Sequence, residues 1–428
     1  MIEELRRSAR ELLMTEGFVT DLDGASAQQT TNVPTLERVL AHMGAPDRGD
    51  AGGPSELRDL RGLPWSSIDN VETRDVDQVE MAEPVPGGHR IRVAIADVDA
   101  FVPRGSPLDA RAAQNTVSVY GAGVVLPMLP EALSEGVTSL LPNQDRLALV
   151  AEFVVDADGV SREHAVYRAL VRNTAQLDYE SVSAWLSRKG PLPPAAHALE
   201  EQLRMQHEAA IHLHAQRERL GALEFERRET QLVMRDGDVA GVVEIQRGPA
   251  RDLIEDFMIA ANSVIAGYLE ANNVSWVRRM VGAPERWPQI VAIAADHGAD
   301  LPPTADRRAL GAFLRAQRER DPASFAELSL SVLRLLGSGR YVVEHRAEEL
   351  EAHFALGVDD YTHFTAPNRR FADIATQRIV KAVLAGAPSP YTDAEMEEIA
   401  AQSTIMEDRA KSVERKIQAR VMKRTAIP

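Results

Sequence analysis

A chain of 428 residues with 44% hydrophobic and 26% charged side chains can bury one large core or two moderate ones, which excludes a disordered protein. It contains no cysteine, so disulfides, thiolate zinc sites and a cysteine nucleophile are excluded. The formal net charge of −16 argues against non-specific duplex binding over a broad basic surface, although an acidic shell with one basic channel would still admit a nucleic acid.

Residues 1–45 predict a small helical region. Apolar side chains recur at helical spacing over residues 2–16, and residues 34–43 predict a second short helix. Two such helices form either a helix-turn-helix-like unit or a simple structural lead-in. Residues 46–56 are rich in glycine, proline and aspartate and predict a linker. We therefore expect one large domain over residues 57–428.

The N-terminal sequence and the hydropathy pattern bear on location. The first predicted helix mixes acidic and basic residues and has no uncharged apolar core, so it is unlike a signal peptide. No run of about 18 apolar residues predicts a membrane-spanning helix. We expect a cytoplasmic monomer with no membrane and no disulfide-linked partner.

Residues 57–428 predict strands followed by helices. Strands are predicted over 89–96, 116–129 and 146–173, and two hairpins turn at Asp156–Gly159 and around Asp236–Gly237. Helical periodicity predicts helices over residues 195–220, 251–271, 286–297, 306–319, 324–336, 371–385 and 393–425. A strand-rich first half followed by a helical second half indicates an α+β fold.

Three carboxylates crowd into residues 69–77. Asp69, Asp75 and Asp77 have a spacing that can fold onto one hard cation or two, with oxygen ligands of the kind Mg²⁺ accepts. The alternatives are a solvated acidic loop and a calcium loop, but Thr73 and Arg74 stand where a calcium loop needs its glycine turn and alternating ligands. Apolar residues precede the run and a strand follows it, which predicts that the carboxylates lie at an edge of the core.

The acidic run and the strand after it resemble a known family. IDNVETRDVDQ and the later IRVAIADVDAFVPRGSPLDARA are similar to the catalytic domain of the RNase II/RNB exoribonucleases. That family has an Ile-Asp, then an Asp-x-Asp-Asp run, then a strand ending in Ile-Ala-Asp. Gln78 departs from the pattern, because the family has a second aspartate there. The resemblance implies an RNB-type catalytic domain, a mixed sheet packed with many helices, preceded here by the small helical region.

YTHFTAPNRRFADIATQR at residues 361–378 resembles the family's second signature, with substitutions at Ala366, Asn368 and Phe371. Arg369 matches the first arginine of this signature, which the family places against the scissile phosphate. A guanidinium can hold two phosphate oxygens and stabilise the charge that grows during phosphoryl displacement. Taken alone, the pair of arginines would indicate a surface salt bridge.

Two glutamates extend the resemblance. Glu255, in RDLIEDFMIAANSVIAGYL, falls on the family's ribose-contacting glutamate. A carboxylate that accepts from a 2′-hydroxyl favours RNA over DNA. Its alternative is an ordinary acidic residue on an amphipathic helix. Glu414 matches a further glutamate near the family's active site.

Three aromatic residues also match family positions. Tyr120 and Phe225 fall where the family clamps stacked bases at the two ends of a narrow channel, and Tyr179 falls beside the 3′-terminal nucleotide. Stacking on an aromatic ring contributes roughly 1–3 kcal/mol per base and tolerates any sequence. Any one of these rings is more often part of a core.

The resemblance implies a processive 3′-to-5′ exoribonuclease that hydrolyses single-stranded RNA to 5′-nucleoside monophosphates. Asp69, Asp75 and Asp77 would hold Mg²⁺, or Mn²⁺ in its place, and catalysis would rest on Asp75, Asp77 and Arg369. Two ions roughly 4 Å apart would activate a water and steady the leaving 3′-oxygen. Gln78 adds no negative charge, so we expect one ion to bind more weakly than in relatives with a carboxylate there.

Two other classes compete with this interpretation. The first is a catalytically weakened RNB-fold protein that binds RNA as a regulator, in which Gln78 would be the cause of the weakened activity. Release of mononucleotides from a labelled RNA strand distinguishes a nuclease from such a regulator. A DNA-binding protein led by the N-terminal helices fits the overall charge poorly. The sequence shows neither the family's cold-shock barrels nor its S1 barrel, so we expect a more open channel mouth.

Overall fold

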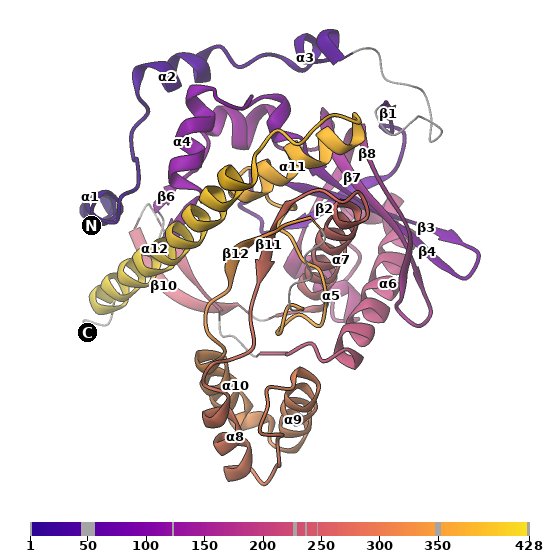
Figure 1. Ribbon diagram of the computed structural model, residues 1–428, viewed down its shortest axis with the longest axis vertical. Coiled ribbons are helices and arrows are strands. Elements are labelled where there is room, and N and C mark those ends of the chain that lie inside the picture. Colours follow the sequence, from indigo (N-terminus) through magenta and orange to yellow (C-terminus); the bar gives the residue numbers. More distant parts are fainter. Residues whose placement is uncertain are drawn as a thin grey trace.

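A computed structural model describes residues 2–43, 56–121, 124–225, 229–235, 238–245, 247–346 and 352–425. Its centre is a sheet in the strand order β1-β8-β2-β3-β4-β7, in which β7 also pairs with β8 (Figure 1). The strands are β1 (Leu57–Asp59), β2 (Trp65–Asp69), β3 (Gln78–Val85), β4 (Gly88–Ala96), β7 (Asp145–Asp156) and β8 (Ser161–Asp178). Strands β1 and β2 run parallel to β8 and the other pairs are antiparallel, so the sheet is mixed. Because β8 pairs first with β7 and at its end with β2, the sheet closes on itself.

Side-chain alternation along the strands divides the core in two. In β4, Ile91, Val93 and Ile95 face one apolar cluster, whereas Ala94 and Ala96 face the other. Helices α6 (Glu200–Arg219) and α7 (Pro249–Ala271) pack into the first cluster. Helix α11 (Phe371–Leu384) contributes to both clusters, so it ties the two faces together.

Two short helices of the body were not predicted from the sequence. Helix α4 (Pro107–Asn115) begins at Ser106, whose hydroxyl accepts the Asp109 backbone N–H at 3.3 Å. Helix α5 (Tyr179–Leu186) begins where β8 ends, and the Asp178 carboxylate accepts the Ser181 N–H at 2.7 Å. These caps satisfy backbone donors that a helix start leaves unpaired.

A helical lobe projects from the body at the bottom of Figure 1. It contains α8 (Trp287–Asp296), α9 (Arg307–Arg320) and α10 (Pro322–Leu336), which bury an apolar cluster of their own. The antiparallel pair β11 (Trp276–Met280) and β12 (Arg340–Glu344) carries the chain into the lobe and back.

The N-terminal region forms three helices, α1 (Ile2–Thr15), α2 (Gly24–Thr31) and α3 (Leu36–Met43). The second was not predicted. Each contacts a different part of the body: α1 packs on α12 (Asp393–Thr425), α2 on α4, and α3 on β7. The predicted linker over residues 46–56 lies outside the described residues except for Glu56.

The α+β prediction is confirmed, and so are the predicted helices from α6 to α12. The hairpin at Asp156–Gly159 joins β7 to β8 as predicted. Strands β9 (Glu229–Arg235) and β10 (Asp238–Ile245) pair antiparallel, but the turn predicted between them lies outside the described residues. Within the described ranges, no helix is both long and apolar enough to cross a membrane.

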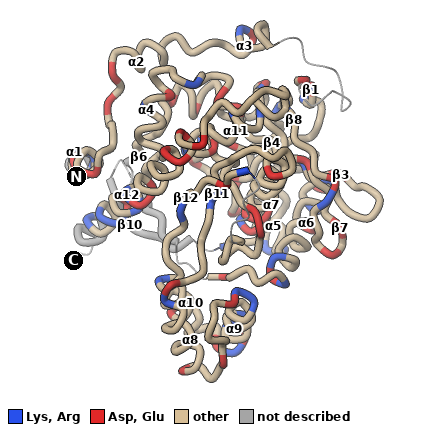
Figure 2. Tube along the Cα trace, in the orientation of Figure 1, with Lys and Arg blue, Asp and Glu red and all other residues tan. Residues whose placement is uncertain are grey.

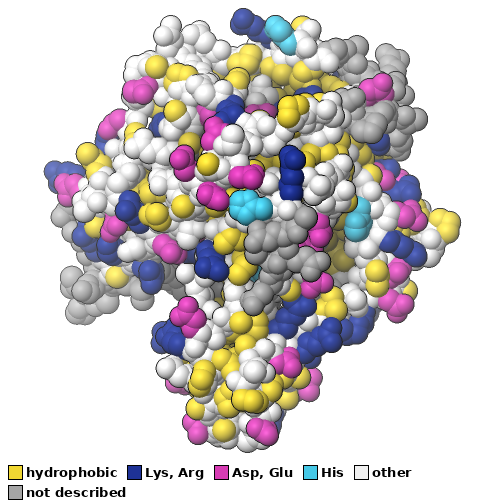
Figure 3. Space-filling model, in the orientation of Figure 1, with side chains coloured by type: hydrophobic (Ala, Val, Ile, Leu, Met, Phe, Trp, Pro, Cys, Tyr) yellow, Lys and Arg dark blue, Asp and Glu magenta, His cyan; other side chains and the backbone are white. Residues whose placement is uncertain are grey.

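Basic side chains gather on particular elements despite the acidic total. Figure 2 shows Lys and Arg along α9 and near the end of α12, and Figure 3 shows Lys and Arg side chains gathered beside the helical lobe. The basic stretch of α12 is partly neutralised, because Lys411 pairs with Glu407 at 2.7 Å and Lys416 with Glu16 at 2.6 Å. Part of this stretch therefore fastens α12 rather than presenting free charge.

Candidate active site

The predicted acidic residues are brought together by the pairing of β2 with β3. Asp69 is the last residue of β2 and Asp77 immediately precedes β3, and the strands run antiparallel with Ser66 opposite Glu80. Antiparallel pairing places the end of one strand beside the start of the next. The loop between them, which carries Asp75, must therefore close over this edge of the sheet.

Hydrogen bonds from two neighbouring segments hold that loop. The Ser139 hydroxyl donates to the Arg74 carbonyl at 2.6 Å and accepts the Val76 N–H at 2.9 Å. The Gln176 side-chain amide donates to the Thr73 carbonyl at 2.9 Å. The backbone around Asp75 is thus held by the body of the protein, unlike that of a free solvated loop.

Burial makes these carboxylates costly to charge. Asp69 is 6% exposed and Asp77 is 3% exposed. Burial raises the pKa of Asp69 to about 6 and the pKa of Asp77 to about 7, while Arg369 acts in the opposite direction on both. Asp69 Oδ1 accepts the Gln78 amide at 3.1 Å, but Asp69 Oδ2 has no hydrogen-bond partner among the described residues. An unpaired buried oxygen of this kind fits a site that takes a cation.

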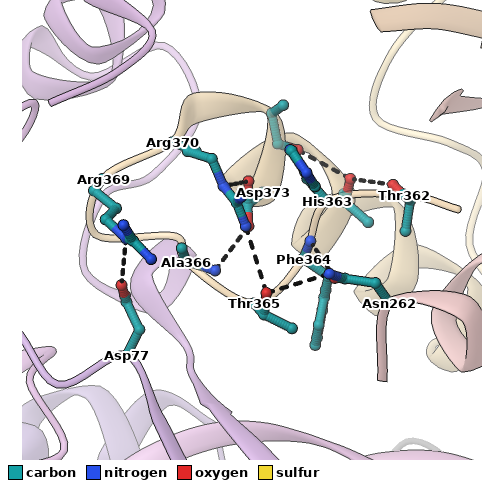
Figure 4. Close-up of polar contacts among 12 residues, drawn as sticks. Asp77, Asn262, Thr362, His363, Phe364, Thr365, Ala366, Arg369, Arg370 and Asp373 are labelled. Carbon is teal, nitrogen blue, oxygen red and sulfur yellow. Dashed lines mark hydrogen bonds and ion pairs between the residues drawn. The ribbon is translucent and has the colours of Figure 1, made fainter. Parts of the chain in front are cut away.

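Arg369 lies at this cluster although it is distant in sequence (Figure 4). Its Nε is 3.6 Å from Asp77 Oδ2, and its side chain is 52% exposed. Next to it, the Asn368 backbone N–H donates to Asp77 Oδ1 at 3.0 Å. Among the described residues the guanidinium contacts only this carboxylate, so its remaining donors can reach an anionic substrate from the solvent side.

The neighbouring Arg370 has a structural environment. It donates to the fully buried Asp373 carboxylate at 2.9 and 2.7 Å, and Asp373 also accepts the Ala366 N–H at 2.8 Å (Figure 4). The two arginines thus do not form the surface pair that the sequence alone allowed. One of them fastens the loop on which the other is presented.

Asn262 of α7 fixes the other end of this loop. Its Oδ1 accepts the Phe364 N–H at 2.9 Å, and its amide donates to the Tyr361 hydroxyl at 3.1 Å and the Thr365 hydroxyl at 3.3 Å. His363 Nδ1 lies 2.7 Å from the Tyr341 hydroxyl. The loop that carries Arg369 is therefore held from both sides.

Tyr120 and Glu414 meet at one edge of the acidic cluster. The Tyr120 hydroxyl donates to Asp75 Oδ2 at 3.3 Å, and the residue is 40% exposed. Glu414 of α12 accepts the Tyr120 backbone N–H at 3.0 Å. Glu414 thus orients the short strand β5 (Val119–Gly121), while the Tyr120 ring stays accessible.

Tyr179 and Arg251 border the cluster on another side. The Arg251 guanidinium carbon lies 4.3 Å from the Tyr179 ring centroid, and the same side chain donates to Asn70 Oδ1 at 2.8 Å. Burial raises the pKa of Tyr179, and the charges of Asp69 and Glu80 raise it further. Sequence reasoning missed Arg251, although its position four residues before Glu255 places both on one face of α7.

Glu255 and Phe225 are less closely tied to the cluster. Glu255 is engaged by Arg247 at 2.6 Å, and its side chain is 45% exposed. Phe225 packs against the apolar cluster of the helical lobe. Their contacts with substrate stay predictions.

Comparison with known proteins identifies the family. The sequence matches the family model of the RNB domain over residues 57–386. Ribonuclease R of Escherichia coli (strain K12) is 33% identical over 333 residues, which covers 76% of this chain and 40% of that protein. Exoribonuclease 2 of Sodalis glossinidius is 31% identical over 356 residues, which covers 82% of this chain and 54% of that protein. The chain thus spans about half the length of these relatives, or less.

Solved structures share the fold. Mycoplasma genitalium RNase R in complex with ribose methylated single-stranded RNA superposes with a TM-score of 0.84 at 24% identity, covering 96% of this chain and 63% of that one. Yeast Ssd1, a pseudonuclease, gives a TM-score of 0.72 at 18% identity, covering 96% of this chain and 49% of that one.

A mixed sheet with a carboxylate cluster at its edge, joined by an arginine from the loop before α11, defines an RNB-type catalytic domain. The family match covers most of the chain, and the chain belongs to the RNB domain family. The resemblance stated from the two sequence signatures is therefore confirmed.

Proposed function

We propose that this protein is a 3′-to-5′ exoribonuclease that hydrolyses single-stranded RNA processively and releases 5′-nucleoside monophosphates. One observation carries the proposal: the exposed Arg369 lies 3.6 Å from the buried Asp77, beside two further aspartates. A cationic fork next to carboxylates that can hold a divalent ion is suited to phosphodiester hydrolysis. The names of the relatives support the same reaction class.

The residues present fit a divalent metal centre. Asp69, Asp75 and Asp77 would hold Mg²⁺, or Mn²⁺, through carboxylate oxygens, and the unpaired Asp69 Oδ2 is a ready ligand atom. When bound, such ions supply a water activated for attack and stabilise the leaving oxygen. Deprotonated carboxylates are needed for this, so the raised pKa values of Asp69 and Asp77 make metal binding more favourable as the pH rises through about 6 to 7.

The other side chains bind and orient the RNA. Arg369 would hold oxygens of the scissile phosphate, and Asp77 keeps its guanidinium turned toward the acidic cluster. Tyr120, with its exposed ring, and Tyr179 beside Arg251 would stack on bases or ribose near the 3′ end. Phe225 would stack on a base further along the RNA, and Glu255 would accept a hydrogen bond from a ribose 2′-hydroxyl.

Oligo(A) labelled at its 5′ end tests this proposal in a time course with Mg²⁺. We expect a short labelled end product without long intermediates, and a 3′-labelled strand should release its label as a mononucleotide at the earliest times. Internal fragments from both strands would contradict an exonuclease. Chelation with EDTA should stop the reaction.

A second candidate is a catalytically weakened RNA-binding regulator, and Gln78 is the observation that favours it. Its amide donates to Asp69 Oδ1 where the family pattern has a carboxylate. Tight RNA binding without release of mononucleotides would support this alternative.

A further inference from the structure

Glu80 is a buried carboxyl group that the sequence interpretation did not use. It is 0% exposed, and neither of its carboxylate oxygens has a hydrogen-bond partner among the described residues. It pairs across the sheet with Ser66, whose hydroxyl is also buried without a partner. A buried carboxylate left in this state costs several kcal/mol or more, so it must be neutralised by a proton or by a cation.

Glu80 lies on the strand that begins immediately after Asp77. It lies two residues after Gln78 on the same strand, so both side chains point to one face of β3, roughly 7 Å apart along the strand. Gln78 reaches Asp69 Oδ1 at 3.1 Å from that face. Asp77 lies three residues before Glu80 and therefore faces the other side of β3, so Asp69, which Gln78 reaches, is the carboxylate that Glu80 can approach.

The electrostatic environment agrees with this placement. Burial raises the pKa of Glu80, and the charge of Asp69 raises it further. The charges of Asp69 and Glu80 both raise the pKa of Tyr179. Three oxygens of these two carboxyl groups, Asp69 Oδ2 and both oxygens of Glu80, have no hydrogen-bond partner in the part of the chain that the structure describes.

We propose that Glu80 is a fourth carboxylate of the divalent-metal site and supplies, on the Asp69 side, the negative charge that Gln78 lacks. The inference rests on the proposed function of Asp69, Asp75 and Asp77 as metal ligands. It changes the expectation drawn from Gln78 alone. Because Glu80 supplies the carboxylate that residue 78 lacks, the ion on that side should bind about as tightly as in relatives with an aspartate at residue 78.

Binding of Mn²⁺ to the full chain without RNA tests the inference independently of activity. The electron paramagnetic resonance signal of free Mn²⁺ gives the number of bound ions and their affinity. We expect Glu80→Gln to lower the affinity for the Mn²⁺ ion on the Asp69 side by about tenfold or more. We expect Gln78→Asp in the Glu80→Gln background to recover most of this affinity, because it returns a carboxylate to the same face.

Glu72→Gln is the matched control. Glu72 is exposed in the same loop, so the variant removes one nearby negative charge without removing a ligand, and screening should limit its effect to about twofold. Unchanged Mn²⁺ number and affinity in Glu80→Gln would overturn the inference and identify Glu80 as a neutral core carboxyl. An equal loss in Glu72→Gln would overturn it as well.

The neutral amide of Glu80→Gln has nearly the shape of the carboxyl group, so thermal melting in EDTA should show no loss of stability.

Should this variant fail to fold, Gln78→Asp alone decides. The inference predicts less than about a threefold gain in affinity, because a carboxylate is already present, and a gain of about tenfold or more would overturn it. If wild type releases mononucleotides while Glu80→Gln binds Mn²⁺ normally, only the inference fails. If Mn²⁺ binding needs Glu80 but no RNA is hydrolysed, only the proposed function fails.

Discussion

Arg369 and Arg370 are adjacent in sequence and have opposite environments. Arg369 is half exposed and touches Asp77 at 3.6 Å, whereas Arg370 is 22% exposed and is bonded to Asp373, which is fully buried. A family signature distinguishes the two by position, but residue types alone do not. The physical distinction is how each arginine uses its donors: Arg370 makes two hydrogen bonds to Asp373, whereas Arg369 makes one longer contact with Asp77 and is more exposed to a ligand.

Alanine substitutions should separate these two roles. Arg369→Ala should lower the rate of hydrolysis by about 10²–10³-fold, because it removes charge stabilisation at the phosphate. It should lower the free energy of unfolding by less than Arg370→Ala does, because Asp77 keeps its hydrogen bond from the Asn368 N–H. Arg370→Ala should lower the free energy of unfolding by about 3–5 kcal/mol, since it leaves Asp373 charged and buried without its partner. Single-turnover cleavage and denaturant unfolding measure the two effects. Full turnover in a stable Arg369→Ala protein would count against its role at the phosphate.

Helix α7 is the element that aligns the site. Arg251 and Asn262 project from it toward two different loops, the first to Asn70 and the second to Phe364 and Thr365. The acidic loop and the arginine loop thus share one rigid support. Packing of the apolar face of α7 into the larger core holds that support in position.

Asn262→Ala tests this alignment. The change leaves the buried Phe364 N–H without an acceptor, which should cost about 1–3 kcal/mol of stability, and it should slow hydrolysis because the Arg369 loop loosens. Asn272→Ala is the control, since that residue is exposed at the end of the same helix. Equal activity of the two variants, measured well below their melting temperatures, would show that α7 does not position the loop.

The sequence allowed good prediction of elements with clear periodicity and poor prediction of those that depend on context. Long amphipathic helices such as α9 and α12 were expected within two residues of their observed bounds. Helices α4 and α5 were missed because each is short and is defined by a capping residue and by packing. Strands β11 and β12 were missed because each is short and the helical lobe separates the two partners in sequence.

The same division applies to the site. The two signatures predicted that Asp77 and Arg369 meet, which the structure bears out at 3.6 Å. Arg251 and Glu80 were not predicted. Their relevance comes from contacts and burial that depend on which strands and helices pack together. The position of Glu80 between two apolar residues, Val79 and Met81, was the signal that pointed to it.

At the scale of the whole molecule, the site depends on parts of the chain that are far apart in sequence. The closed sheet supplies the acidic cluster, the loop before α11 supplies Arg369, and α12 supplies Glu414, which fixes Tyr120. Helix α1 packs on α12 and shares an apolar cluster with it, so the first residues brace the helix that carries Glu414. The geometry of the candidate site therefore depends on contacts between several distant parts of the described chain.

Asp77→Asn is the most direct test of the central claim that a carboxylate of this cluster and Arg369 form one hydrolytic centre. The asparagine retains an oxygen for the Asn368 N–H, so the loop should stay in place and the affinity for single-stranded RNA should change by less than about threefold. Turnover of 5′-labelled oligo(A) with Mg²⁺ should fall by about 10³-fold or more, while the control Glu72→Gln stays near wild type. An Asp77→Asn protein with near-normal turnover would contradict the account.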